Sequence, residues 1–389
     1  MSTTHSRLLP ADTFQAAVLR HTDPATRVVE LDSIFRHNVH CYHGIDAWDR
    51  RGDRLLYLGF DRNDTASLVI REGRKGVERV IGQTRCFDYH TAAWQQWALD
   101  DTAVLFLAGE VDGSNRWALA PVDGSGPAQP VPALDGRMVR QVVDHGHQVW
   151  TYSQREIDQP QLIERVDLRT MQAETILTAE DAYQRLPKGY RFPGQYSFSH
   201  PVPNPSGTRA FFKLMITPDG RPTMHSAFFM LNIETGEISY HSREMSGHPF
   251  WVDDQRILNI VHTGDNVHRA LILIDCDTGD VDKITDSVIE GPGHPSLSPD
   301  GRTYVTDSFA NEMTESPIYL VDAETGVMRE ILRLNHRFTP TDPKVGYDPK
   351  VVTRGQPHPV WSPDGKRLLM HSNRGGTKYS LLVVTPDLS

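Results

Sequence analysis

A repeated His-Pro dipeptide is the feature of this sequence best able to support chemistry. It occurs four times in the second half of the chain, at His200, His248, His294 and His358. A turn rich in Pro, Asp, Ser or Gly follows within about seven residues each time, and an apolar run comes next. Clustered imidazoles can hold a metal ion or act as a general base, whereas a single His is more often a turn former or a polar residue with a structural partner. The pattern predicts that His-Pro opens a strand in several repeated units, and that these histidines meet.

The spacing of strand-like segments predicts an all-β fold, a seven-bladed β-propeller. Short apolar or alternating runs separated by turn residues recur four to a unit, with a period of about 40 to 45 residues. The units begin near residues 43, 90, 140, 199, 247, 293 and 357. The last unit ends after its third strand, and the alternating segment 27–32 is predicted to supply the fourth and close the ring. An irregular β-sandwich, or two separate β domains, is the alternative.

Ring closure makes residues 1–389 one expected domain, with 1–26 as an N-terminal extension. In that extension, Phe14–Leu19 could form one or two helical turns. An insertion rich in Tyr, Arg, Pro and Gly, residues 179–194, precedes the fourth unit. In a propeller the first strand of each blade lines the central channel, so the four histidines should converge at one mouth of it. His43 and His90 hold similar places before the first and second blades.

Composition excludes several classes of function. The net charge of -10 argues against binding to nucleic acid or to an anionic membrane. No apolar stretch approaches the roughly 18 residues that span a bilayer, and no signal-peptide core is visible, so a cytoplasmic protein is expected. The cysteines Cys41, Cys86 and Cys276 lie far apart, which fits a reducing compartment. Cys41, between His40 and His43, could be a ligand or nucleophile, but a buried structural thiol is expected.

With these repeats in view, the chain resembles the oligogalacturonate lyases, polysaccharide lyases built as seven-bladed propellers. More loosely, it is similar to the propeller-type ulvan lyases. The segments that carry the resemblance are Gly247-His248-Pro249-Phe250-Trp251, Gly293-His294 and Gln356-Pro357-His358-Pro359. The likeness is clearest from about residue 194 to the end. The Ser-Pro-Asp-Gly turns are shared with many propellers, including non-catalytic TolB-like ones.

The resemblance implies roles for the matching residues. His248 corresponds to the general base of the family, and His294 and His358 correspond to metal ligands. Gln356 stands where the family has another His ligand, and Thr353 where it has a Gln. The Arg that the family carries in its fourth blade has no clear counterpart. The implied cofactor is a divalent metal, Mn²⁺ in the first instance.

The implied reaction is β-elimination at a uronic acid: a base removes the C5 proton, the 4-linked sugar leaves, and a 4,5-unsaturated end remains. A divalent metal or cationic side chains at the carboxylate would stabilise the enolate-like state. The residues expected at the site are, as catalytic groups, His248, His200 and Tyr196; as substrate contacts, Arg191, Lys213, His43 and Tyr190; and as metal ligands, His294, His358 and Gln356.

Functions from different classes stay open at this point. The first is a lyase, monomeric or homodimeric, that acts on an acidic oligosaccharide of galacturonate or ulvan type. The second is a non-catalytic binding propeller of the TolB-like kind, with the same fold and no chemistry. A propeller hydrolase ranks last, because it would need paired carboxylates and none recurs at the blade openings.

Overall fold

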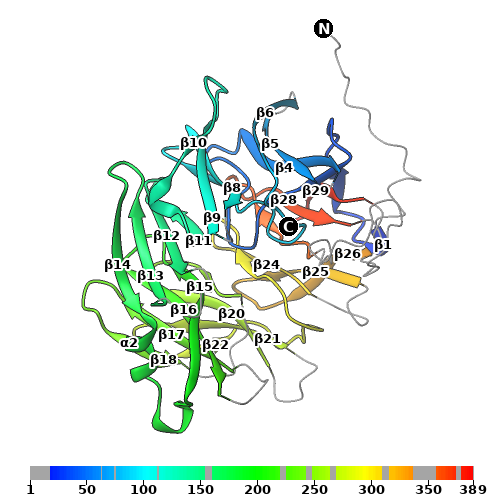
Figure 1. Ribbon diagram of the computed structural model, residues 1–389. Coiled ribbons are helices and arrows are strands. Elements are labelled where there is room, and N and C mark those ends of the chain that lie inside the picture. The colour runs from blue at the N-terminus through cyan, green and yellow to red at the C-terminus, as the bar shows by residue number, and fades with distance from the viewer. Residues whose placement is uncertain are drawn as a thin grey trace.

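Short antiparallel strands form seven sheets in the computed structural model, and these sheets are the blades of a ring (Figure 1). The structure describes residues 18–62, 64–73, 76–111, 114–153, 160–219, 225–241, 248–262, 269–308, 315–335, 356–373 and 378–388. In Figure 1 the colour passes round the ring in chain order, and the blue strands of the first blade lie near the red strands of the last. The predicted seven-bladed β-propeller is confirmed.

The first three blades follow one another along the chain. Blade 1 consists of β3 (His37–Val39), β4 (Arg54–Arg62), β5 (Thr65–Glu72) and β6 (Val77–Thr84). Blade 2 consists of β7 (Gln96–Ala98), β8 (Ala103–Val111), β9 (Ser114–Pro121) and β10 (Gln129–Pro130), and is followed by the 3-10 turn η1 (Pro132–Leu134). Blade 3 consists of β11 (Arg137–Val143), β12 (Gln148–Ser153), β13 (Leu162–Asp167) and β14 (Gln172–Thr178).

The remaining blades carry the four His-Pro dipeptides. Blade 4 consists of β15 (Gly194–Pro203), β16 (Arg209–Pro218), β17 (His225–Asn232) and β18 (Ile238–His241). Blade 5 consists of β19 (Phe250–Trp251), β20 (Arg256–His262), β21 (Arg269–Asp275) and β22 (Val281–Lys283). Blade 6 has β23 (Ser296–Leu297), β24 (Thr303–Asp307), β25 (Glu315–Asp322) and β26 (Met328–Asn335). Blade 7 has β27 (Val360–Trp361), β28 (Leu368–Ser372) and β29 (Ser380–Thr385).

Two N-terminal strands complete the last two blades. The strand β2 (Arg27–Glu30) pairs antiparallel with β29, so the predicted closing strand is confirmed. The strand β1 (Val18–Thr22) pairs with β26 and becomes a fifth strand of blade 6. The expected helical turns are therefore wrong for residues 18 and 19, because the open edge of β26 offers backbone partners, whereas an isolated helix of one or two turns is unstable. Residues 14–17 lie outside the described part of the chain.

Neighbouring blades are locked together by apolar packing and by hydrogen bonds from indole groups. The Nε1 atom of Trp97 in blade 2 donates to the carbonyl oxygen of Ala47 in blade 1, over 3.3 Å. Trp251 in blade 5 donates likewise to Val202 in blade 4, over 2.9 Å. A buried indole N–H needs such a partner, so each bond fixes one inner strand relative to the next. The inner strands thus form a rigid frame for the side chains of the channel.

The insertion before blade 4 contains the helix α2 (Ala179–Gln184) and the 3-10 turn η2 (Lys188–Tyr190). Thr178 caps α2, because its hydroxyl accepts from the backbone N–H of Asp181. Among the helices that the structure describes, none has the length and apolar character needed to cross a bilayer.

Candidate active site

The four His-Pro histidines converge, as the repeat pattern predicts. The ring centroids of His248 and His294 lie 4.2 Å apart, and those of His294 and His358 lie 4.3 Å apart. The ring of His200 lies 6.3 Å from that of His248. These side chains come from the openings of blades 4 to 7, so the ring brings residues distant in sequence into one cluster. Gly247 lies outside the described residues.

The chain between β3 and β4 adds two more rings to this cluster. The ring of His43 lies 5.3 Å from that of His294. The ring of Tyr42 lies 5.0 Å from that of His358 and 6.2 Å from that of His248. Both side chains are buried. The sequence indicated His43 but not Tyr42, because only the His recurs in the repeat.

The tautomer of His248 is set by a backbone carbonyl. Its Nδ1 atom lies 3.2 Å from the carbonyl oxygen of Gly293, which can only accept, so Nδ1 carries the proton and Nε2 keeps its lone pair. Gly293 is required there, because a Cβ would lie 1.9 Å from the carbonyl oxygen of Asp307 and 2.7 Å from Oγ1 of Thr306. The glycine therefore lets blade 6 come close enough to orient the base candidate of blade 5.

Asp307, at the end of β24, organises two of the histidines. Its carboxylate lies 3.0 Å from Nδ1 of His294 and accepts the backbone N–H of the same residue over 2.6 Å. It also accepts the backbone N–H of His358, over 3.2 Å. A carboxylate on Nδ1 leaves the lone pair of His294 on Nε2, which is the form that binds a metal ion. No repeat in the sequence marks Asp307, and the sequence analysis missed it.

The side chain of His358 is held from two sides. Its Nε2 atom lies 3.2 Å from Oε1 of Gln356. Behind it lies a deeper pair, in which the ring of His371 is 5.6 Å from that of His358 and 3.9 Å from that of His40. Thr353 lies outside the described residues. Within the described ranges, no three His, Cys, Asp or Glu side chains are arranged so that they could hold one metal ion together.

Four of the clustered imidazoles are uncharged at neutral pH. Burial, followed by the positive charge of neighbouring groups, lowers the pKa of His43, His200, His248 and His358 well below the ordinary value. The side chains of His200 and His248 are partly exposed, but both lie deep enough in the protein for burial to be the main cause of their lowered pKa. Burial also lowers the pKa of His40 to about 3. Neutral imidazoles present lone pairs that can accept a proton or bind a cation.

Two buried cations accompany the histidines. Arg140 in β11 is 1% exposed, and its Nη2 donates to the carbonyl oxygen of His43 over 3.2 Å. Its Nε and Nη1 atoms have no hydrogen-bond partner among the described residues, and burial lowers its pKa. Lys213 in β16 is 9% exposed, and burial, then the charge of Arg140, lowers its pKa to about 8. The sequence analysis missed Arg140, although it lies on the innermost strand of its blade, as His200 does.

Three predicted residues make their contacts around the insertion. The hydroxyl of Tyr196 donates to Glu180, and this bond and burial raise the pKa of Tyr196 to about 12. Arg191 donates to carbonyl oxygens within and just after α2, and the ring of Tyr190 lies 5.9 Å from that of Tyr240. These contacts tie the three side chains to the insertion and blade 4, so their assignment to a site stays a prediction.

Cys41 is a structural thiol, as expected. It is buried, its Sγ atom lies 3.6 Å from the carbonyl oxygen of Thr91, and burial raises its pKa to about 12. A thiol with that pKa stays protonated at neutral pH, which argues against a role as a nucleophile.

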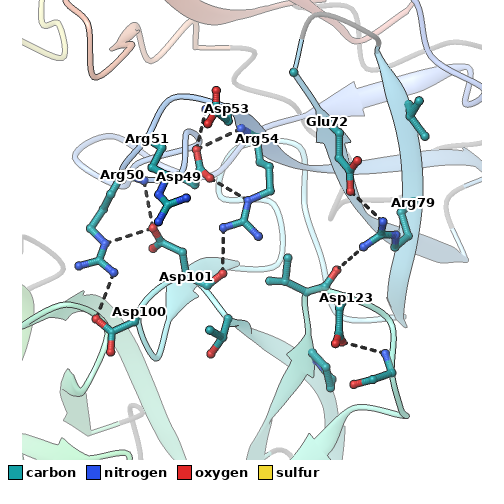
Figure 2. A pocket seen from close by; sticks show the side chains of 16 residues that line it. Asp49, Arg50, Arg51, Asp53, Arg54, Glu72, Arg79, Asp100, Asp101 and Asp123 are labelled. Carbon is teal, nitrogen blue, oxygen red and sulfur yellow. Dashed lines mark hydrogen bonds and ion pairs between the residues drawn. The ribbon is translucent and has the colours of Figure 1, made fainter.

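A charged cleft of about 1100 Å³ lies between blades 1 and 2 (Figure 2). Three of its basic groups are engaged by its acidic groups: Arg54 contacts Asp49 over 2.7 Å, Arg79 contacts Glu72 over 2.8 Å, and Arg50 contacts Asp100 and Asp101 over 3.1 Å each. Six acidic and four basic side chains line it. An anionic sugar gains little there, because three of the four guanidinium groups that it would need already have carboxylate partners.

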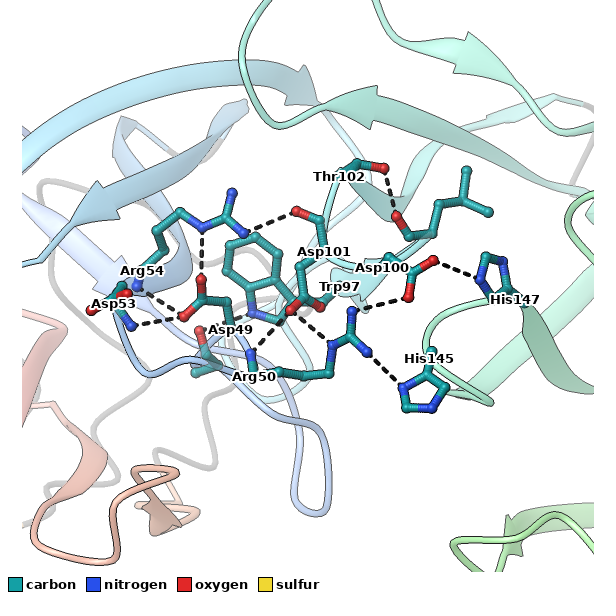
Figure 3. A network of polar contacts seen from close by, with 12 residues as sticks. Asp49, Arg50, Asp53, Arg54, Trp97, Asp100, Asp101, Thr102, His145 and His147 are labelled. Carbon is teal, nitrogen blue, oxygen red and sulfur yellow. Dashed lines mark hydrogen bonds and ion pairs between the residues drawn. The ribbon is translucent and has the colours of Figure 1, made fainter.

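The same region contains a polar network that joins the turns of three blades (Figure 3). Arg50 of blade 1 contacts Asp100 and Asp101 of blade 2 over 3.1 Å each, and Nδ1 of His145 before blade 3's second strand over 2.6 Å. His147 also contacts Asp100, over 2.9 Å. Exposed ion pairs of this kind contribute about 1 kcal/mol or less each. The network therefore supports the ring and is not a candidate for catalysis.

Comparison with known proteins supports the fold. No protein-family model and no curated protein sequence matches the chain. An oligogalacturonate lyase solved in complex with manganese has a TM-score of 0.69 at 17% identity, over 95% of this chain and 96% of that chain. The oligogalacturonate lyase from Vibrio parahaemolyticus has a TM-score of 0.68 at 12% identity, over 93% and 94%. The propeller domain of the Trilobed protease from Pyrococcus furiosus has a TM-score of 0.52 at 10% identity, over 88% and 95%. At these identities the likeness shows the fold, and the expected resemblance to oligogalacturonate lyases is confirmed at that level.

Proposed function

We propose that this chain is a lyase that cleaves short acidic oligosaccharides by β-elimination, with His248 as the base that takes the C5 proton of a uronic acid. One observation carries the proposal: His248 is a neutral, half-buried imidazole with its tautomer fixed, and it lies in a cluster with two buried cations. A base of this kind can accept a carbon-bound proton at neutral pH, provided that the charge left behind is stabilised.

Arg140 and Lys213 are the groups that would bind the uronate carboxylate. The Nε and Nη1 atoms of Arg140 are buried without a hydrogen-bond partner among the described residues, which is costly unless a ligand supplies acceptors. Lys213 acts electrostatically on both His200 and His248. As the C5 proton leaves, negative charge moves onto the carboxylate, and fixed cations in a site that excludes water stabilise it.

The donor atoms around His294 also fit a divalent metal ion. Asp307 holds His294 in the tautomer with its lone pair on Nε2. The 3.2 Å between Oε1 of Gln356 and Nε2 of His358 is close to the ~3.1 Å that separates adjacent ligands on one octahedral ion with bonds of ~2.2 Å. A bound ion would replace the proton that Nε2 shares with this oxygen. We therefore propose His294, His358 and Gln356 as ligands of a divalent cation, Mn²⁺ being the first to test because a solved neighbour contains manganese. Such an ion would supply Lewis-acid stabilisation of the substrate carboxylate.

The fold-level likeness to two oligogalacturonate lyases favours oligogalacturonates as the first substrates to test. Ulvan-type oligosaccharides are the second, since they also offer a uronate with a 4-linked leaving group. Two features of this chain affect the part of the site that would bind the substrate carboxylate. Gln356 stands where the family has a His, and the buried Arg140 lies in blade 3. The choice of uronic acid is therefore where this chain is expected to differ from its structural neighbours.

The test measures the ultraviolet absorbance of the 4,5-unsaturated product. Wild type is incubated with trigalacturonate and with ulvan oligosaccharides, with and without Mn²⁺, and compared with His248→Ala and with His145→Ala, a His of the inter-blade network. The expected result is product from wild type and His145→Ala, and a loss of at least ~10²-fold in His248→Ala. Equal turnover by His248→Ala would remove the base from the mechanism. Binding of the oligosaccharides without any product would favour the non-catalytic, TolB-like alternative.

A further inference from the structure

We infer that Tyr42 is the general acid that protonates the leaving oxygen, and that His200 relays the proton to it. This inference rests on the proposed β-elimination, which needs a proton at the glycosidic oxygen O4 because a sugar alkoxide is a poor leaving group. His248 cannot deliver that proton in the same step, since it is then accepting the one from C5. A second proton-bearing group must therefore lie beside the base.

Tyr42 lies at the centre of the imidazole cluster. Its ring centroid is 5.0 Å from that of His90, 6.1 Å from that of His200 and 6.2 Å from those of His248 and His294. It comes from blade 1, on the segment between β3 and β4, whereas the base candidate comes from blade 5. The phenol therefore lies beside the base candidate, on the side of the cluster that the first blade supplies.

The Tyr42 hydroxyl is directed at a His that can move a proton. It lies 3.5 Å from Nε2 of His200, and Nδ1 of the same ring lies 2.5 Å from Oγ of Ser199. A hydroxyl can donate or accept, so either tautomer of His200 keeps both hydrogen bonds. The backbone of His200 is left-handed, with a φ of 53°, in a strand that shifts register between Ser199 and Val202. Strain of this kind persists where the fold holds a side chain in a particular direction.

A buried cation lies over the ring of the phenol. The guanidinium of Arg140 lies 5.4 Å from the centre of the Tyr42 ring, and the two groups interact electrostatically. A cation next to a phenol stabilises the phenolate relative to the neutral form. Arg140 is therefore placed to serve the carboxylate of the substrate and the transient phenolate together.

The protons transferred in one turnover balance without any outside reagent. The C5–H bond breaks and its proton goes to Nε2 of His248, while the electron pair forms the C4–C5 double bond. The C4–O4 bond breaks with its electrons on O4, which takes the proton of the Tyr42 hydroxyl. The proton on His248 then passes to the phenolate by way of His200, whose ring lies 6.3 Å from that of His248. Both residues regain their starting forms.

The experiment compares leaving groups in Tyr42→Phe, which keeps the ring packing. The probes are trigalacturonate and a galacturonate carrying 4-nitrophenol at O4, whose leaving oxygen needs no acid. The expected loss is about 10² to 10⁴-fold on the trisaccharide and less than about 10-fold on the activated probe. In D₂O the variant is expected to place deuterium at C5 of recovered trisaccharide, because the base still works. The variant His248→Ala is expected to lose both activities and the exchange.

Equal losses of Tyr42→Phe on the two probes, or none on either, would overturn the role of Tyr42. The variant Ser199→Ala tests the relay: a several-fold lower kcat with an unchanged KM on the trisaccharide supports it, and an unaffected kcat overturns it. Thermal unfolding of each variant shows whether a loss reflects misfolding, and recovered C5 exchange shows an intact base. Wild type that makes no unsaturated product from any uronate contradicts the lyase proposal itself, which is a different outcome from all of these.

Discussion

Replacement of Lys213 by Met is predicted to stabilise the protein while it damages the function. Lys213 is 9% exposed, and burial lowers its pKa from 10.5 to about 8. That difference is about 2.5 pKa units, and each unit corresponds to about 1.36 kcal/mol, so the charged form costs up to about 3 kcal/mol in the folded state. Met fills a similar volume without a charge. At pH 7, Lys213→Met should therefore raise the free energy of unfolding by up to about 3 kcal/mol.

The contribution of Lys213 to the free energy of unfolding should change with pH in one direction only. Below pH 8 the ammonium is charged in the folded and unfolded states, and the full cost is present. Between pH 8 and 10.5 the unfolded chain binds more protons at this group than the folded chain, so the contribution of Lys213 to stability rises with pH. The stability difference between Lys213→Met and wild type should therefore shrink across that window, by at most about 1.4 kcal/mol per pH unit.

The measurement is chemical denaturation of both proteins at pH 7 and at intervals up to pH 10, together with kcat and KM for the substrate. The loss of one hydrogen bond to a charged group predicts a KM that is about 10 to 100-fold higher. The control is Lys283→Met on β22, an exposed Lys that contacts Asp286 and should change stability by less than about 0.5 kcal/mol. A less stable Lys213→Met at pH 7, or a difference that is constant with pH, would refute the reasoning.

Two further substitutions test the groups that orient the histidines. Gly293→Ala should destabilise the fold by about 2 kcal/mol or more and lower turnover, because its Cβ would lie 1.9 Å from the carbonyl oxygen of Asp307. The control in the denaturation and activity assays is Gly109→Ala, whose Cβ would have no atom within 4 Å. Asp307→Asn should lower the affinity for Mn²⁺ about 10 to 100-fold, measured by calorimetry, because Nδ1 of His294 loses its carboxylate. Asp322→Asn, at the exposed end of β25, should bind Mn²⁺ as wild type does, and equal affinities in both variants would contradict the role of Asp307.

The fold could be predicted because a short sequence pattern recurs from blade to blade. Each blade repeats strands, turns and, in blades 4 to 7, a His-Pro dipeptide, and the repetition outweighs the weakness of any one strand. The segment around Arg27 was predictable as the closing strand because the last blade lacked a partner for β29. The strand β1 was not predictable, since its pairing depends on the edge that β26 exposes in space. The secondary-structure propensity of residues 18–22 does not reveal that an edge strand will be available to pair with them.

The site was predictable only where it repeats. His248, His294 and His358 recur at equivalent places, so their convergence followed from the ring. Arg140 and Tyr42 each occur once, in blades without a His-Pro dipeptide: Arg140 lies on the inner strand β11, and Tyr42 lies between β3 and β4. Only the assembled ring shows that they face the same cluster. The Tyr and Arg residues in and next to the insertion were predicted as sugar contacts from their residue types alone, and this assignment stays a prediction. Their contacts in the structure are with the insertion and blade 4.

The four His-Pro dipeptides do not share one backbone conformation, and the difference bears on what the channel is for. His200 and His358 are left-handed, with φ of 53° and 46°, whereas His294 is not. A left-handed residue with a side chain costs about 1 to 3 kcal/mol, so blades 4 and 7 carry strain at this position that blade 6 avoids. Together with a buried Arg140 and the low pKa of the imidazoles, this strain lowers the stability of the folded state. A ring locked by indole hydrogen bonds and a closing strand can hold such a cluster, and convergent lone pairs beside buried cations are what an acidic sugar requires.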